Sequence, residues 1–166
     1  MKRHACIVMA FLALATPALA EATFDEAVAL FEDKNYAEAK TIAEAFAAKD
    51  DARAMAMLGA MYQRGYGVPT DLQKAVEWFT KAAEKGHPGA QFSLAMLNLD
   101  GSLGSVHADV AAKWLEQSAA GGNAQAQYNL GLVYSGSYGT EPNWAKAAVW
   151  FRKAADQNMP EAEYNL

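Results

Sequence analysis

Cysteine is almost absent from this sequence, since Cys6 is the only one in 166 residues. A disulfide framework needs several paired cysteines, so the chain is not a small domain held together by disulfides. Segments rich in valine, isoleucine and threonine are scarce, which leaves little support for β-strands. After the first twenty residues, no apolar run approaches the roughly 18 residues of a membrane span. What is present is a chain 52% hydrophobic and 20% charged, rich in alanine and suited to packed helices.

The first twenty residues follow the order of a secretory signal peptide. A basic start from Lys2 to His4 precedes an apolar stretch from Ala5 to Ala15, and Ala18-Leu19-Ala20 offers the small residues that a signal peptidase recognises. The alternative is a helix packed on the domain, but such a helix would alternate polar and apolar faces, and this segment does not. We therefore predict cleavage after Ala20. The mature protein is then periplasmic or secreted, without Cys6, a lipid anchor or a membrane span.

Residues of the same kind recur every 36 positions without a gap. The recurring positions hold Leu58, Leu94, Leu130 and Leu166; Trp78, Trp114 and Trp150; Ala83, Ala119 and Ala155; and the aromatic residues Phe92, Tyr128 and Tyr164. A period of this length is typical of stacked units that bury their apolar faces against one another. The sequence therefore predicts an all-α fold, an α/α solenoid of stacked helical hairpins.

Each unit contains the pattern of two helices joined by a turn. In the first unit, Ala54, Leu58 and Met61 lie on one helical face, and Gly65-Tyr66-Gly67-Val68-Pro69 cannot continue that helix. Thr70 and Gln73 have the spacing of a capping box for the second helix. We predict repeats at 52–87, 88–123 and 124–159, a partial unit at 160–166, and a shorter N-terminal hairpin at 21–51.

This arrangement resembles the Sel1-like repeat, a branch of the tetratricopeptide superfamily. The residues that carry the resemblance in the first unit are Leu58-Gly59, Gly65-Tyr66-Gly67-Val68, Asp71, Lys74-Ala75, Trp78-Phe79 and Lys81-Ala82-Ala83. The resemblance runs from Ala52 to Leu166, and a weaker tetratricopeptide similarity extends it to Thr23. It implies a right-handed superhelix that acts as a scaffold for protein partners. The middle unit departs from the pattern at Asn98, Leu103 and Asp109.

Two sets of repeated residues are expected in the core. Gly59, Ala95 and Gly131 are small, which allows neighbouring helices to approach closely. The three repeated tryptophans should fill the space between helices, because they share a face with alanines. A ladder of tryptophans that stacks on a ligand is the alternative interpretation.

Residues suited to catalysis are few. Without its first twenty residues the chain has 12 lysines and arginines against 19 aspartates and glutamates, a net charge of −7 that disfavours nucleic-acid partners. Its two histidines, His87 and His107, fall on turns at opposite ends of a hairpin, about 20 Å apart by helical rise. We therefore expect each histidine to be a turn or helix-cap residue, with no catalytic residues, no metal site and no cofactor.

One set of apolar residues is not explained by the core leucines. Phe92, Met96, Leu99, Tyr128 and Leu132 lie on the first helices of their units, on the side opposite the leucines. The same side carries Arg53, Gln63 and Gln125. Apolar strips of this kind mark partner sites when they are exposed, and neighbouring helices cover them when they are not. We predict that these eight residues bind an extended peptide or a partner helix.

The predicted function is that of an exported scaffold, an adaptor or regulator in the bacterial envelope that binds a protein or peptide. Two alternatives remain open at this point. The first is a hydrolase that acts on cell-wall material or antibiotics, and the second is an accessory module of a protein that continues past Leu166.

Overall fold

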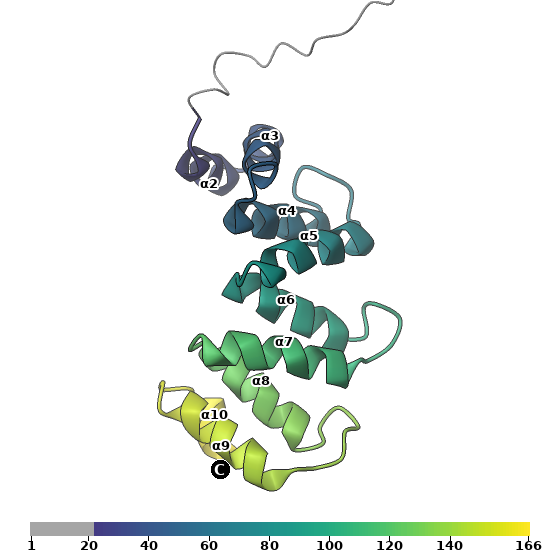
Figure 1. The fold of residues 1–166 in the computed structure, drawn as a ribbon, viewed down its shortest axis with the longest axis vertical. Coiled ribbons are helices and arrows are strands. Elements are labelled where there is room, and N and C mark those ends of the chain that lie inside the picture. Colours follow the sequence, from purple (N-terminus) through teal and green to yellow (C-terminus); the bar gives the residue numbers. More distant parts are fainter. Residues whose placement is uncertain (1–21) are drawn as a thin grey trace, which may run out of the picture.

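The computed structural model describes residues 22–166, so the predicted signal peptide lies outside the described residues. Within 22–166 the chain forms nine helices and no strand (Figure 1). They are α2 (Phe24–Glu32), α3 (Tyr36–Ala47), α4 (Ala52–Arg64), α5 (Leu72–Glu84), α6 (Pro88–Leu99), α7 (Ala108–Ala120), α8 (Ala124–Tyr134), α9 (Trp144–Ala155) and α10 (Pro160–Tyr164). The predicted all-α solenoid is confirmed.

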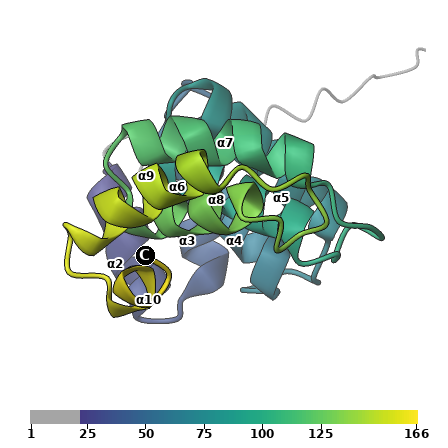
Figure 2. The same cartoon turned by 90° about the horizontal axis from the view of Figure 1, so that it is seen from below.

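The helices form four hairpins that stack in chain order. Each helix packs mainly against the helices that precede and follow it in the sequence. Viewed from the C-terminal end, successive hairpins lie behind one another, with α10 beside α9 (Figure 2). None of the described helices is long and apolar enough to cross a membrane.

The start of α5 differs from the prediction. Its N-cap is Asp71, whose side chain accepts a hydrogen bond from the Lys74 amide at 3.0 Å, and not Thr70. Asn143 occupies the same position 72 residues later and accepts from the amide of Lys146. A carboxylate or amide oxygen is a strong N-cap acceptor, so the polar residue next to the helix takes this role.

Within each hairpin, a small residue on the first helix faces a large one on the second. A Cβ atom added to Gly59 would lie 2.6 Å from a ring carbon of Phe79, and one added to Gly131 would lie 2.6 Å from a ring carbon of Phe151. The middle hairpin has Ala95 and Leu115 at the matching positions, both fully buried. The prediction that these small residues permit close approach of the helices is confirmed.

The repeated tryptophans are not full core residues, which corrects the prediction. Trp78, Trp114 and Trp150 are only partly buried. The next residue in each helix, Phe79, Leu115 or Phe151, is at most 3% exposed and fills the space between helices instead. Adjacent residues lie about 100° apart around a helix, so the tryptophan falls at the margin of the buried face.

A lysine ammonium group lies over two of the partly buried tryptophan rings. The Lys81 ammonium lies 4.4 Å from the centre of the Trp78 ring, and that of Lys153 lies 4.1 Å from the Trp150 ring. Trp114 packs against both core clusters, one formed around hairpins α2–α3 and α4–α5 and the other around α6–α7 and α8. It therefore joins the two halves of the core.

Buried glutamines connect successive hairpins. The side-chain amide of Gln91 donates to the Ala83 carbonyl at 3.2 Å and to Oε1 of Gln117 at 3.1 Å. Gln127, 36 residues later, donates to the Ala119 carbonyl and accepts from Gln157 at 2.8 Å. Each glutamine thus adds a hydrogen bond to a carbonyl in the last turn of the preceding helix, which also accepts from a backbone amide of the turn that follows.

The loops between helices hold the N-terminal hairpin in place. Phe31, Tyr36 and Tyr66 form an aromatic cluster in which the Tyr36 and Tyr66 rings stack at 5.1 Å. Gly67 has a φ of +70°, and a Cβ there would lie 2.5 Å from Cβ of Tyr36. In the middle unit Leu103 replaces this glycine and packs against the first core cluster, so the loop remains a packing element despite its different sequence.

Candidate protein-binding surface

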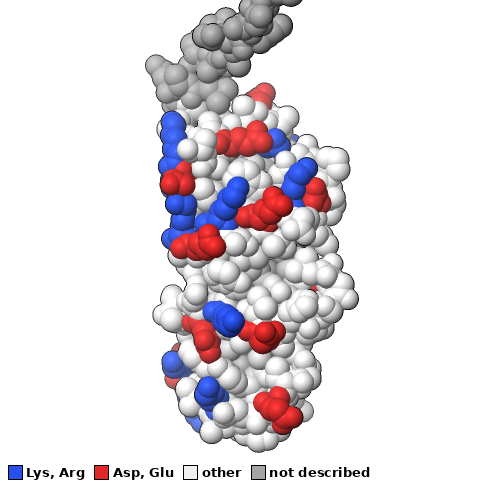
Figure 3. All heavy atoms as spheres, turned by 45° about the vertical axis from the view of Figure 1, so that its right-hand side comes forward, with Lys and Arg blue, Asp and Glu red and all other residues white. Residues whose placement is uncertain are grey.

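Charges are divided unequally between the first and second helices of the hairpins. The sequences of α6 and α8 contain no charged residue, and α4 contains only Arg53 and Arg64. The second helices α5, α7 and α9 carry most of the charges of the three repeats. Figure 3 shows one face on which charged side chains gather over the N-terminal hairpins and leave an uncharged stretch across the middle of the stack.

Four of the five predicted apolar residues are partly exposed. Phe92 and Met96 on α6 are half-buried and pack against the second core cluster. On α8, Tyr128 and Leu132 are also half-buried, and the Tyr128 ring lies 5.7 Å from that of Phe151. These side chains keep one side against the core and leave the other available for contact.

Leu99 does not belong to this surface, and the prediction for it is wrong. It is 3% exposed and forms part of the second core cluster. Leu99 is the last residue of α6, where the chain turns toward α7. Its side chain is enclosed in that cluster together with residues of α7 and α8.

The three predicted polar residues lie in different settings. Gln125 on α8 is exposed and Gln63 on α4 is half-buried. The Arg53 guanidinium donates to the Asp51 carboxylate at 2.7 Å and lies 4.7 Å from the Phe24 ring. This hydrogen bond lowers the pKa of Asp51. Arg53 therefore fastens α4 to the N-terminal hairpin, whereas Gln125 is available for a partner.

Sequence reasoning missed two polar residues on the same helices. Ser93 and Asn129 occupy the same repeat position, 36 residues apart, and both are half-buried. The Asn129 side chain donates to the Gln125 carbonyl at 2.8 Å, which fixes its amide beside Tyr128. The sequence contains a signal for this pair, since Ser93, Asn129 and Asn165 are polar residues spaced 36 positions apart.

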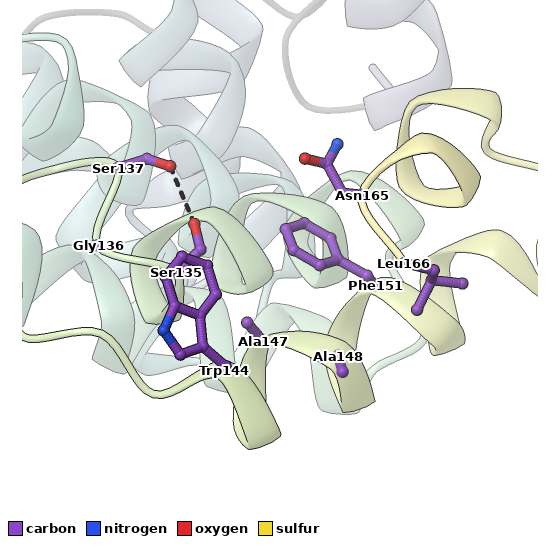
Figure 4. Close-up of a pocket in the computed structure, with 9 residues that line it drawn as sticks. All are labelled: Ser135, Gly136, Ser137, Trp144, Ala147, Ala148, Phe151, Asn165 and Leu166. Atoms are coloured by element: carbon purple, nitrogen blue, oxygen red, sulfur yellow. Dashed lines mark hydrogen bonds between the residues drawn. The ribbon is translucent and has the colours of Figure 1, made fainter.

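An uncharged hollow of about 540 Å³ lies between the α8–α9 loop, α9 and the residues after α10. Figure 4 shows Ser135, Ser137 and Trp144 on one side of it and Phe151, Asn165 and Leu166 on the other. The hydroxyl groups of Ser135 and Ser137 lie 2.9 Å apart and bond to each other. Trp144 is 67% exposed here, so the hollow has an aromatic wall, and none of the side chains that line it is charged.

The two histidines of residues 22–166 form hydrogen bonds with residues close to them in the sequence. His87 caps α6, where its Nδ1 accepts from the Ala90 amide at 3.1 Å, and burial lowers the His87 pKa. This agrees with the predicted capping role. His107 begins α7 without a capping bond, and its Nε2 lies 2.8 Å from the Ser105 hydroxyl. Within residues 22–166, no group of three or more histidine, cysteine or acidic side chains is placed to hold a metal.

Tyr134 is the most strongly perturbed titratable group of residues 22–166. Its hydroxyl donates to Glu116 at 2.6 Å, and burial together with this bond raises the pKa of Tyr134 to about 12. The phenol therefore stays protonated at neutral pH and joins α8 to α7. The role of Tyr134 in the structure is thus to connect two helices.

The stacked hairpins, with charges confined mainly to the second helices, define a tetratricopeptide-like α/α repeat protein. The family model described as Sel1 repeat matches residues 52–87, 88–123 and 124–159. The chain belongs to the Sel1 repeat family, which confirms the resemblance predicted from the sequence. Arrays of this family are typical protein-interaction modules. Among curated proteins, none matches the chain.

Two solved structures support the same fold. The Sel1 repeat protein from Oxalobacter formigenes is 29% identical, with a TM-score of 0.77 over 84% of this chain and 58% of that one. The protein c5321 is described as a protective antigen of uropathogenic Escherichia coli strains with an SLR fold. It is 32% identical, with a TM-score of 0.72 over 80% of this chain and 28% of that one. The chain thus spans 58% and 28% of the lengths of these two proteins.

Proposed function

We propose that this protein is an exported, non-catalytic adaptor that binds an uncharged peptide segment of a partner protein on its first helices. The observation that carries the proposal is the pairing of two charge-free helices, α6 and α8, with half-buried apolar side chains on both. The alternative of a hydrolase has no observation in its favour among residues 22–166.

The proposed contact has a physical basis in incomplete burial. Phe92, Met96, Tyr128 and Leu132 each keep exposed apolar area, and covering such area gains roughly 25 cal/mol per Å². A partner segment without charges suits helices that offer no ion to pair with a buried charge. The amides of Gln125 and Asn129 supply hydrogen bonds for the backbone of that segment.

The proposed location in the envelope rests on the sequence. A basic start, an apolar stretch and small residues before position 21 follow signal-peptide order. Expression in a Gram-negative host followed by mass spectrometry of the periplasmic fraction should give a mature terminus at Glu21. An intact Met1 terminus in that fraction would contradict export by cleavage.

The binding face can be tested with a charge placed on it. Met96→Glu should prevent capture of partner proteins from an envelope extract, because an unpaired carboxylate resists burial at an interface. Since Met96 also contacts the core, a second variant carries Gln125→Glu together with Asn129→Glu, nearer the solvent. The matched control is Lys113→Glu, at an exposed position on α7.

The expected result is loss of capture with both face variants and full capture with Lys113→Glu, while thermal melting by circular dichroism stays cooperative. Full capture by the variant carrying Gln125→Glu and Asn129→Glu would place the binding site elsewhere. Loss of capture by the α7 control would show that charge alone, and not the face, decides the result.

A further inference from the structure

The outward side of α9 carries three cations around an apolar centre. Lys146, Arg152 and Lys153 are all exposed there, and Val149 between them is 55% exposed. The sequence of α9 contains no acidic residue. We call these four residues, together with Ala145, the basic face.

The basic face departs from the pattern of the other repeats. At the two positions where it carries Ala145 and Val149, the middle repeat has the charged residues Asp109 and Lys113. All four are exposed, so the apolar character does not come from a change in burial. An open hollow of about 600 Å³ runs beside the face, where Ala120 and Trp150 contribute further apolar surface and Tyr134 and Glu116 of the neighbouring helices complete the lining. Exposed apolar surface in place of charge is typical of an interaction site.

The outward side of α2 has the opposite charge in the same arrangement. Asp25, Glu26, Glu32 and Asp33 surround Ala29, and all five are exposed. The helix α2 contains no cation, and none of these carboxylates forms an ion pair within residues 22–166. We call these five residues the acidic face.

The two faces correspond position by position. Carboxylates stand at 26, 32 and 33 around residue 29, and cations stand at 146, 152 and 153 around residue 149. Both sets have the spacing i, i+3, i+6 and i+7, which places them on one side of a helix. The two segments therefore offer faces of opposite charge, four carboxylates against three cations, each with a small or apolar residue at its centre.

We propose that copies of this chain associate head to tail, with the acidic face of one copy on the basic face of the next. A two-fold pairing of basic faces would bring six cations together, and a pairing of acidic faces would bring eight carboxylates together, so like-charge repulsion disfavours both. Head-to-tail contacts do not close on themselves unless the rotation between copies closes a ring. The association adds a second surface to the one proposed for the partner peptide and does not depend on it.

Sedimentation velocity of the purified protein at several concentrations tests the proposal. The weight-average sedimentation coefficient should rise with concentration at about 20 mM salt, and the association should weaken about tenfold or more at about 500 mM salt, where exposed charges are screened. A protein that stays monomeric at low salt overturns the proposal. An association that salt leaves unchanged also overturns it.

Charge reversal identifies the two faces. One variant carries Arg152→Glu and Lys153→Glu, and the other carries Glu32→Lys and Asp33→Lys. Each should be monomeric alone, because it lacks one of its two faces. Their mixture keeps one intact junction, between the acidic face of the first and the basic face of the second. The two reversed faces also carry opposite charges, so the mixture should recover the salt-sensitive association that each variant lacks alone.

Lys113→Glu is the matched control, since it changes an exposed charge on α7 at the repeat position of Val149. It should associate as the unaltered protein does. All variants should keep the helical circular dichroism spectrum because the changed side chains are exposed. Association of either reversed variant alone, or a mixture that stays monomeric, would overturn the assignment of the faces.

Discussion

The contact between Gly59 and Phe79 allows a quantitative test of how the hairpins pack. A methyl group at position 59 would lie 2.6 Å from the ring, far inside van der Waals contact, so Gly59→Ala forces the helices apart or the ring out of place. Overpacking of this kind costs about 1–3 kcal/mol. The higher helix propensity of alanine returns up to about 1 kcal/mol, which leaves a net loss near 1 kcal/mol.

The middle repeat indicates how the clash is relieved. It has alanine and leucine at the positions of Gly59 and Phe79, and both are fully buried. Phe79→Leu alone should create a small cavity and destabilise the protein by about 1 kcal/mol. The double variant Gly59→Ala with Phe79→Leu should recover stability, with a coupling energy of about 1–2 kcal/mol between the two sites. The coupling energy compares Gly59→Ala in the presence of Phe79 with the same change in the presence of Phe79→Leu. The helix propensity of alanine contributes equally to both and therefore cancels.

Urea denaturation followed by circular dichroism measures the four free energies of unfolding. The matched control pairs Gly59→Ala with Phe151→Leu, in a hairpin remote along the stack, where the effects should add within about 0.5 kcal/mol. If the adjacent pair is also additive within that margin, the distance between Gly59 and Phe79 does not limit the packing. That result would refute the idea that alanine and leucine in the middle repeat compensate for each other.

Two further predictions concern a cap and the core. Because burial lowers the pKa of His87 and its Nδ1 accepts a hydrogen bond, the folded state favours the neutral ring. The stability from His87 is therefore complete above the unfolded-state pKa of about 6.5 and is lost as the pH falls through the lower folded value. His87→Asn, with the cap residue found at Asn123, should remove this part of the pH dependence in thermal melts, and an unchanged pH profile would exclude His87 as its source. In the core, Leu115→Ala should cost about 2–5 kcal/mol and Trp114→Ala about 1–3 kcal/mol, and the reverse order in urea denaturation would contradict the assigned burial.

The fold was predictable because its signals are periodic. The 36-residue register places Leu58, Leu94 and Leu130 at equivalent positions, and all three are at most 2% exposed in the structure. Small residues such as Gly59 were also predictable, since only close helix approach explains their recurrence. Recurrence alone could not separate Trp78 from Phe79, because both repeat and only the angle around the helix decides which one is enclosed.

The candidate site was less accessible to sequence reasoning. Leu99 has the helical position of an outward residue, but it is the last residue of α6 and is enclosed in the second core cluster. Arg53 has the helical position of a surface residue, but its guanidinium is held by Asp51 beside the Phe24 ring, in another hairpin. Burial in the second core cluster decides the role of Leu99, and a contact with the N-terminal hairpin decides that of Arg53.

The buried glutamines between hairpins have a consequence for the curvature of the molecule. Gln91 and Gln127 bond to carbonyls at the ends of the preceding helices, and hydrogen bonds depend on direction where alanine contacts do not. The two amide groups therefore add a directional restraint to the packing that orients successive hairpins. Their repeat position holds Met55 in the first unit and Glu163 in the last, neither of which supplies an amide donor. Directional hydrogen bonds thus restrain the joints on either side of the middle hairpin and with them the relative placement of α6 and α8. The joint between the first two hairpins is held differently, by the Phe31, Tyr36 and Tyr66 rings and by Arg53 over the Phe24 ring.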